Sequence, residues 1–239
     1  MKPKKLLSVL ILNAETALDK RTYDPTAHFA LHLGQMRAPF SELNIADATD
    51  ARALRKVTHM IITGSSASVA SGNLPAWYES AAAVIRAAVA AGIPTLGVCF
   101  GHQLLARIYG GETSVQPAKE PEVGWNEVRV CKDDPVLGPA GTAFSVFNLH
   151  FDEVVSLPKK AMQVAQSDRC RIHGFRLSGV PVWGIQSHPE ITPSIARQIL
   201  TGTQRLFSAE KQPYIKEALQ AEAHDSGHIR ILLRNFLRQ

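Results

Sequence analysis

The chain contains 239 residues, of which 45% are hydrophobic and 20% are charged. This length and balance suit one globular domain with a sizeable core, and they exclude a disordered, coiled-coil or collagen-like chain. The net charge of +5 comes from 26 basic and 21 acidic residues that are not interleaved with aromatic ones, so we expect no nucleic-acid partner.

The cysteine pattern and the N-terminal run bear on the cellular compartment. Cys99, Cys131 and Cys170 are far apart, and this spacing predicts neither a disulfide framework nor a metal site. The apolar run 6–12 follows lysines, as in a short signal peptide, but residues 13–16 lack the small-residue cleavage site of such a peptide. No apolar stretch of the sequence approaches the roughly 20 residues of a membrane span. We therefore expect a cytoplasmic protein without membrane contact.

The first half of the chain alternates apolar runs with helical patterns, which is typical of a parallel sheet covered by helices. The expected strands are residues 6–12, 43–45, 59–62 and 93–98, and the expected helices are 25–36, 51–56, 76–91 and 102–109. A loop at 65–74 precedes the longest of these helices. The strand 93–98 leads into Cys99, at the end of a strand where open α/β sheets bind their ligands.

The second half changes to short alternating runs, which indicate hairpins and a partly antiparallel region. The expected strands are residues 126–131, 144–147, 154–155, 162–166, 174–177 and 182–186, and amphipathic helices are expected at 194–207, 214–223 and 228–237. The fold class is therefore α/β, with an open, mostly parallel sheet, helices on both faces, a partly antiparallel extension and C-terminal helices. We expect a single domain over 1–239, with a core at about 1–192 and a C-terminal helical segment at about 193–239.

Cys99 stands in the run Gly-Val-Cys-Phe-Gly, between the expected strand 93–98 and the expected helix 102–109. Glycines two residues before and after a central residue permit a sharp strand-to-helix turn, because neither has a Cβ that could clash. The N-terminus of the following helix would favour the thiolate over the thiol. The pattern predicts a nucleophilic cysteine, and the alternative is a small buried hydrophobic residue.

A nucleophilic cysteine requires a base, and the base requires an orienting acceptor. The expected strand 182–186 is followed by Ser187, His188, Pro189 and Glu190. If His188 ends a strand beside that of Cys99, its imidazole faces the same sheet edge, and Glu190 can hydrogen-bond its other nitrogen. The alternative is a structural or solvated histidine with no catalytic part.

Several motifs in these regions resemble those of one enzyme family. They are GVCFGHQLLA at 97–106, GIQSHPE at 184–190, IITGS at 61–65, VGW at 123–125, LHFDEV at 149–154, LP at 157–158 and AQSD at 165–168. Together they resemble the class I, or triad, glutamine amidotransferases, whose fold is flavodoxin-like. Within that family the chain resembles stand-alone members that are similar to the amidotransferase domain of GMP synthetase and to γ-glutamyl peptidases.

The resemblance implies a catalytic role for five residues. Cys99 would attack the side-chain amide carbon of glutamine and form a γ-glutamyl thioester, with release of ammonia. His188 would act as general base and then acid, and Glu190 would hold its tautomer. The backbone N–H groups of Gly64 and Phe100 would stabilise the tetrahedral oxyanion. No cofactor is implied.

The resemblance also implies substrate contacts, with one departure from the family pattern. Gln103 and Ser65 match positions near the bound glutamine, and the segment Leu149, His150, Phe151 and Asp152 matches the one that holds the α-amino and α-carboxyl ends of the substrate. Many family members have glycine where this chain has Phe151. A bulky ring beside the expected α-amino end makes the substrate contacts differ from those of such members.

The expected activity is hydrolysis of a γ-glutamyl amide. The sequence leaves two alternatives for what accepts the released group. Ammonia would pass to a separate synthetase subunit, or the enzyme would be a γ-glutamyl peptide hydrolase with the same triad and another leaving group. A catalytically silent regulatory module of the same fold is a further alternative. An α/β-hydrolase-like esterase is disfavoured because its acid precedes the histidine, whereas Glu190 follows His188.

Overall fold

The computed structural model describes residues 6–70, 72 and 74–239. The lysines at positions 2, 4 and 5, and two residues of the expected loop 65–74, lie outside the described residues. Within the described part, the strands form one nine-stranded sheet in the order β2-β1-β3-β4-β9-β8-β7-β5-β6. The strands are β1 Val9–Asn13, β2 Phe40–Asn44, β3 His59–Ile62, β4 Thr95–Val98, β5 Val115–Val130, β6 Ala143–Val154, β7 Ala161–Gln166, β8 Gly174–Leu177 and β9 Val182–Ile185.

Five strands, β2, β1, β3, β4 and β9, run parallel to one another. Strands β1, β3, β4 and β9 are buried along their whole length, as expected for central strands that are covered on both faces. The C-terminal ends of β4 and β9 are adjacent, because Val98 pairs with Ile185. The residues that follow these two strands therefore begin at the same edge of the sheet.

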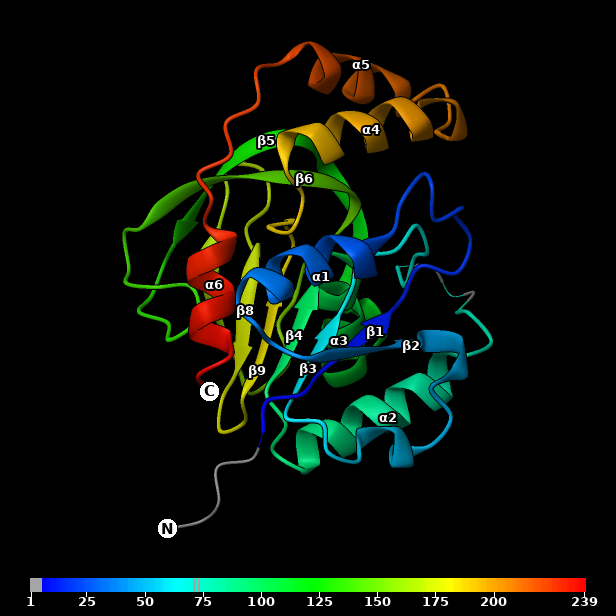
Figure 1. Cartoon of the computed structure of the whole chain (residues 1–239). Coiled ribbons are helices and arrows are strands. Elements are labelled where there is room, and N and C mark those ends of the chain that lie inside the picture. Colours follow the sequence, from blue (N-terminus) through cyan, green and yellow to red (C-terminus); the bar gives the residue numbers. More distant parts are fainter. Residues whose placement is uncertain (1–5, 71, 73) are drawn as a thin grey trace.

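The remaining strands are antiparallel and extend the sheet beyond β9. The longest pair is β5 with β6, whose register shifts between Pro117 and Glu122. This ribbon curves over the edge of the sheet that holds the ends of β4 and β9 (Figure 1). The fold therefore has the predicted open, mostly parallel sheet with a partly antiparallel extension.

Helices cover both faces of the sheet. Helices α2 (Tyr78–Ala90) and α3 (Phe100–Gly110) pack in one apolar cluster with Leu10 and Ile62, whereas α1 (Pro25–Gln35) and α6 (Ile229–Phe236) pack in another with Ile11 and Ile61. The alternation of side chains along β1 and β3 separates the two clusters. Helices α4 (Pro193–Thr203) and α5 (Gln212–Gln220) lie over the β5–β6 ribbon (Figure 1) and enclose a third cluster.

Several predicted boundaries are wrong. The run predicted at 144–147 and residue 154 of the run predicted at 154–155 belong to the one strand β6, and β5 begins at Val115 rather than at residue 126. The first part of β5 contains prolines and charged residues, which are uncommon in strands, so its sequence does not indicate a strand. Pairing with β6 holds this part in the extended conformation. The strand predicted at 43–45 is β2, which ends before Ile45, and the helix predicted from 102 begins at Phe100.

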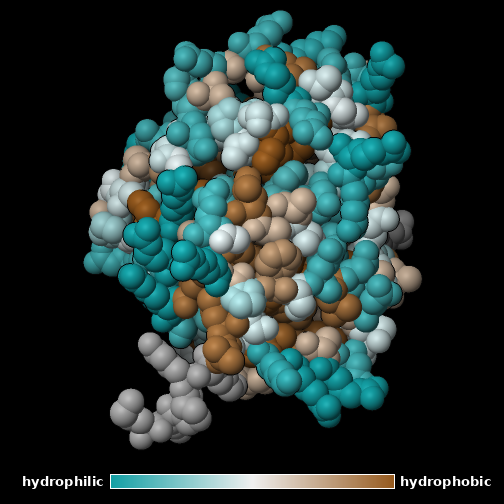
Figure 2. Space-filling model, in the orientation of Figure 1, coloured by the Kyte–Doolittle hydropathy of each residue, from teal (hydrophilic) through white to brown (hydrophobic). Residues whose placement is uncertain are grey.

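The remaining short elements are 3-10 helices at Ile45–Asp47, Ala51–Leu54, Glu112–Ser114 and Gln204–Leu206. Among the described residues, no helix has the length and apolar character needed to cross a membrane. Figure 2 shows hydrophobic side chains gathered on the face covered by α1, where Leu31 is 50% exposed.

Candidate active site

Cys99 occupies a strained turn between β4 and α3. Its backbone has a φ of 49° and a ψ of −102°, a conformation that residues with a side chain rarely adopt. The flanking glycines allow this turn, because a β-carbon on Gly97 would overlap the carbonyl group of Gly101 and one on Gly101 would overlap the backbone of Ile62. The predicted strand-to-helix turn is therefore present, with Cys99 directly before the first turn of α3.

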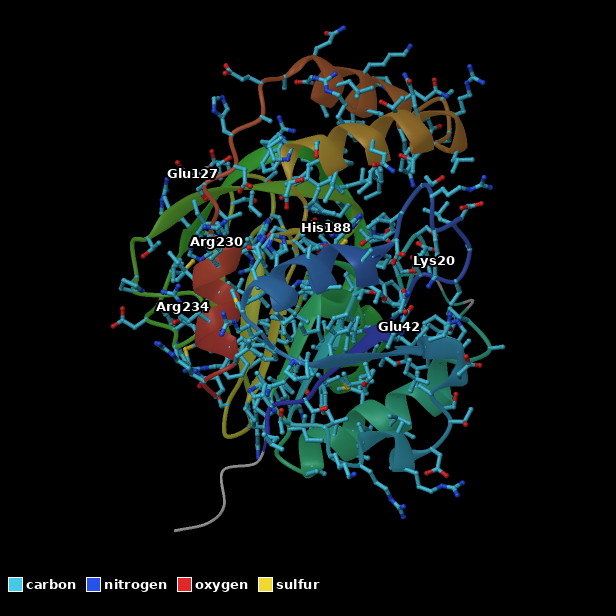
Figure 3. All side chains as sticks on the ribbon, viewed as in Figure 1. Lys20, Glu42, Glu127, His188, Arg230 and Arg234 are labelled. Atoms are coloured by element: carbon cyan, nitrogen blue, oxygen red, sulfur yellow. The ribbon has the colours of Figure 1, made fainter. Side chains whose placement is uncertain are left out.

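His188 and Glu190 follow β9, beside the strand that leads to Cys99. Nδ1 of His188 donates a hydrogen bond to Oε1 of Glu190 over 2.8 Å. The backbone N–H of His188 donates to the carbonyl oxygen of Phe147 on β6, also over 2.8 Å. Figure 3 shows His188 in the interior, between α1 and α4 in that view. The imidazole is thus fixed both through its ring and through its backbone.

The electrostatic surroundings of His188 favour its cationic form. Burial disfavours the charged imidazolium, but the negative charges of the Cys99 thiolate and the Glu190 carboxylate outweigh burial and raise the pKa of His188 to about 10. Glu190 is fully buried, so its charge acts on the ring with little screening by water. The surroundings of His188 therefore favour a protonated imidazole ring at this edge of the sheet.

Gly64 and Phe100, the predicted oxyanion donors, flank the turn on two sides. A β-carbon on Gly64 would lie 2.5 Å from Cε1 of His188 and 2.8 Å from the hydroxyl oxygen of Tyr23, so only glycine fits there. Phe100 is the first residue of α3, where backbone N–H groups have no intrahelical acceptor. Its side chain points into the core and packs against Trp77, which leaves only its backbone for a role at the site.

A pocket of about 190 Å³ opens beside Cys99 and His188. It contains every residue predicted to contact substrate, together with others that the sequence did not suggest. Its lining residues are Leu18, Tyr23, Ser65, Ser66, Ala67, Ser68, Cys99, Gln103, Phe147, Leu149, His150, Phe151, Asp152, His188, Ile191, Ile199, Thr203, Phe207 and Lys211. Glu190 lies behind His188, outside the lining.

A chain of amides connects the thiol to the predicted substrate segment. The Nε2 atom of Gln186 lies 3.6 Å from Sγ of Cys99, and Nε2 of Gln103 donates to Oε1 of Gln186 over 3.2 Å. Gln103 also donates to the carbonyl oxygen of Asp152 over 2.9 Å. The Asp152 carboxylate accepts a hydrogen bond from the hydroxyl of Ser68 over 2.6 Å. The backbone and the side chain of Asp152 are therefore both held in place.

Glu122, His150 and His173 form a buried cluster behind this segment. Nε2 of His150 and Nε2 of His173 lie 3.1 Å and 3.5 Å from the same oxygen of Glu122, while Nδ1 of His150 donates to the carbonyl of Asp152 over 3.0 Å. Burial alone would raise the pKa of Glu122, but its hydrogen bonds to the two histidines outweigh burial and hold that pKa well below its usual range. These three residues could hold a metal ion by geometry. The contacts of the two histidines with Glu122 also explain why the three side chains lie together, and they fix the position of His150.

The sequence predicted neither Tyr23, Phe207 and Lys211 in the pocket nor Gln186 beside the thiol of Cys99. Gln186 could have been found, because residues two apart in an extended chain face the same side and His188 was already placed there. Tyr23 comes from the segment before α1, and its ring meets that of His188 edge-on at 6.2 Å. Phe207 and Lys211 come from the segment between α4 and α5. No sequence pattern brings these distant segments to Cys99.

An open α/β sheet with a cysteine on a strained strand-to-helix turn, beside a paired histidine and carboxylate, defines a class of proteins built for thiol chemistry at a sheet edge. The family described as glutamine amidotransferase class-I matches residues 28–203. The chain belongs to this family, which confirms the resemblance found in its motifs.

Among known proteins, the chain is similar to archaeal proteins named as one subunit of glutamine-hydrolysing GMP synthase. Identity with the protein from Archaeoglobus fulgidus is 37% over 101 residues, which is 41% of this chain and 53% of the relative. With the protein from Methanococcoides burtonii it is 39% over 99 residues, which is 41% of this chain and 51% of the relative. The matched region spans about half the length of these curated relatives.

Solved structures show the same fold over nearly the whole chain. A glutamine amidotransferase from Thermotoga maritima superposes with a TM-score of 0.73 at 19% identity, covering 98% of this chain and 99% of the other. A glutamine amidotransferase from Methylobacillus flagellatus gives a TM-score of 0.70 at 23% identity, covering 97% of this chain and 90% of the other. The predicted fold class is confirmed.

Proposed function

We propose that this protein hydrolyses the side-chain amide of glutamine, with Cys99 as nucleophile, His188 as acid and base, and Glu190 as the orienting carboxylate. The observation that carries the proposal is that the strained turn of Cys99 and the hydrogen-bonded pair of His188 and Glu190 meet at one pocket. Two segments that are distant in sequence meet there, which a merely structural cysteine would not require.

In the first step, the Cys99 thiolate attacks the γ-carbonyl carbon of glutamine and a carbon–sulfur bond forms. The His188 imidazolium then donates its proton to the departing nitrogen as the carbon–nitrogen bond breaks, so ammonia leaves and a γ-glutamyl thioester remains. The raised pKa of His188 supports this order, because a protonated ring can donate to the leaving nitrogen. Neutral His188 is left as the base for the next step.

In the second step, His188 takes a proton from water and the resulting hydroxide attacks the thioester carbon. The carbon–sulfur bond breaks, glutamate leaves, and the thiolate and imidazolium are restored. Both steps pass through a tetrahedral oxyanion, for which the N–H groups of Gly64 and Phe100 are the proposed donors. Loss of one such donor typically costs about 3–4 kcal/mol of barrier.

The test is to incubate the purified protein with glutamine and to quantify ammonia and glutamate together. Equal release of both products, and trapping of a γ-glutamyl group on Cys99 after acid quench, are the expected results. If neither product forms from glutamine or from any γ-glutamyl compound, the proposal is wrong and the chain is a silent module of this fold.

The ammonia acceptor is proposed to be a separate synthetase subunit. Support comes from the curated relatives, whose names describe them as one subunit of glutamine-hydrolysing GMP synthase. Addition of the acceptor protein would then raise the rate of glutamine hydrolysis and link it to formation of the amidated product. A rate that no synthetase subunit changes would favour hydrolysis for its own sake.

The second candidate is a γ-glutamyl peptide hydrolase with the same triad. The observation that favours it is the apolar wall of the pocket formed by Phe151 and Phe207, whose ring centroids lie 5.3 Å apart. Because Phe151 stands where many family members have glycine, this wall changes the contacts to the substrate, which favours a γ-glutamyl substrate other than glutamine. A higher kcat/KM for γ-glutamyl dipeptides than for glutamine would identify this activity, and the reverse order would support the amidotransferase.

A further inference from the structure

The segment that follows α4 lies above the β5–β6 ribbon (Figure 1) and contributes side chains to the pocket. Phe207 and Lys211 of this segment line the pocket, although both lie beyond the residues 28–203 that match the family. Its side chains lie against the predicted substrate segment, since the ring of Phe151 packs on Phe207 at 5.3 Å and on Tyr214 at 6.3 Å. This part of the pocket is therefore built by residues that the family pattern does not specify.

The charges in this pocket are few. Lys211 is the one lysine or arginine among its lining residues, and Asp152 is the one carboxylate among them. Within residues 6–70, 72 and 74–239, the ion pairs formed at 4.0 Å or less do not include Lys211. Its ammonium group instead lies over the ring of Phe151, 4.4 Å from the ring centroid, where a cation is weakly attracted. In the part of the chain that the structure describes, Lys211 thus brings to the pocket a positive charge that has no carboxylate oxygen within 4.0 Å.

Lys211 and Cys99 line the same pocket, and β6 runs from one toward the other. Sγ of Cys99 lies 3.9 Å from the carbonyl oxygen of Leu149, and Phe151 is two residues further along β6, about 7 Å away by strand geometry. In an extended glutamyl group, four carbon–carbon bonds separate the reacting carbonyl carbon from the α-carboxylate carbon, a span of about 5 Å. A substrate with its carbonyl at Cys99 therefore brings its α-carbon groups toward Phe151, Asp152 and Lys211.

We propose that Lys211 binds the α-carboxylate of the glutamyl substrate and is a specificity-determining residue. The inference rests on the proposed function, because it needs a γ-glutamyl carbonyl at Cys99. The Asp152 carboxylate, held by Ser68, faces the same region and pairs with the α-ammonium group of the substrate. The two opposite charges at this end of the pocket thus match the two charges that every free α-amino acid carries.

The test compares the kinetics of Lys211→Met with those of Lys216→Met. Lys216 lies on α5 and is exposed to solvent, so its substitution removes the same charge from the same region outside the pocket. Loss of a charged hydrogen bond to the substrate is expected to raise KM for glutamine about 10- to 100-fold in Lys211→Met, with little change in kcat. Lys216→Met is expected to keep the wild-type KM, and Lys211→Arg is expected to restore most of the affinity.

A second substrate identifies which carboxylate Lys211 recognises. Glutamine whose α-carboxylate is replaced by a carboxamide lacks the proposed partner, so wild type and Lys211→Met should have the same kcat/KM for it. A difference that persists with this compound, or that is seen only with γ-glutamyl dipeptides bearing a carboxylate on the leaving group, overturns the assignment to the α-carboxylate. Wild-type KM for glutamine in Lys211→Met overturns it as well.

These outcomes are distinct from failure of the proposed function. If wild type releases no ammonia from glutamine, the proposed function fails and the inference falls with it. If wild type is active and the two lysine variants behave alike, only the role of Lys211 fails. Binding of glutamine to Cys99→Ala, measured by calorimetry with and without Lys211→Met, gives the same comparison without turnover. Cooperative thermal unfolding of each variant shows that the fold is intact.

Discussion

His32 donates a hydrogen bond from Nε2 to the backbone carbonyl oxygen of Glu190 over 3.1 Å. This contact ties α1 to the carboxylate that holds His188, across 158 residues of sequence. Glu190 is fully buried, and one of its carboxylate oxygens, Oε2, has no hydrogen-bond partner within the described part of the chain. The position of the carboxylate is therefore fixed by the backbone of Glu190 and by one hydrogen bond to His188. Its negative charge lies next to the imidazole ring.

Replacing Glu190 with glutamine keeps the size of the side chain and removes its charge. We expect kcat to fall by about 10²- to 10⁴-fold, because the imidazolium loses its stabilising carboxylate. The Glu190 charge helps to raise the pKa of His188, so its loss lowers that pKa. Protonation of the leaving group needs imidazolium, so the alkaline limb of the kcat/KM profile should move to lower pH.

The measurement for Glu190→Gln is the pH dependence of kcat/KM for ammonia release, with Glu210→Gln as control. Glu210 is exposed to solvent, so its variant should match wild type. A slower Glu190→Gln enzyme whose alkaline limb stays in place would argue that Glu190 serves only the packing of this region.

Cys99→Ala is expected to abolish release of ammonia from glutamine while the fold is kept. Alanine removes the sulfur and leaves the backbone of the turn, so no thioester can form. Cys131→Ala is the matched control, because Cys131 lies at the end of β5 and outside the pocket. Ammonia and glutamate are measured after long incubation at high enzyme concentration. Residual turnover by Cys99→Ala above that of a heat-treated sample would exclude Cys99 as the nucleophile.

Gly64→Ala is expected to lower activity strongly, because its β-carbon would lie 2.5 Å from the ring of His188 and must displace it. Gly34→Ala is the control, since a β-carbon there meets no atom within 4 Å and alanine suits the helix α1. Single-turnover rates and thermal melting are measured for both variants. If Gly64→Ala has the wild-type rate, His188 is not held against Gly64.

Glu122→Gln is expected to lower the free energy of unfolding by about 3 kcal/mol at neutral pH, because it leaves buried histidines without their carboxylate. The pKa of Glu122 in the folded state lies below its ordinary value of 4.5, so the carboxylate stabilises the fold above that pH. This stabilisation is lost as the pH falls through the folded-state pKa. The difference between wild type and variant should therefore shrink in acid.

Denaturant unfolding at a series of pH values checks the Glu122 prediction. Glu120→Gln is the control, because Glu120 is exposed and its ion pair with Arg169, at 3.9 Å, is worth well under about 1 kcal/mol. Equal effects of the two substitutions at neutral pH would show that the buried cluster does not stabilise the fold.

The sequence predicted short strands such as β3 and β8 well and the long β5–β6 ribbon poorly. Strands β3 and β8 have the predicted bounds, because short apolar runs between turns are a local signal. The first part of β5 carries Pro117 and several charged residues, and only its pairing with β6 makes it a strand. A local sequence pattern does not reveal a strand whose extended conformation depends on hydrogen bonds to a partner strand.

At the site, the sequence by itself determined which groups can do chemistry. The glycines around Cys99 and the two-residue spacing of His188 and Glu190 are local constraints, so they predicted the turn and the hydrogen bond found in the structure. Tertiary structure alone decided what surrounds them. His32 behind Glu190 comes from α1, and Lys211 over Phe151 comes from the turn before α5. Their positions depend on how these segments pack against the rest of the fold. No periodic pattern in a single sequence predicts such packing, because it depends on many contacts between residues that are distant in the chain.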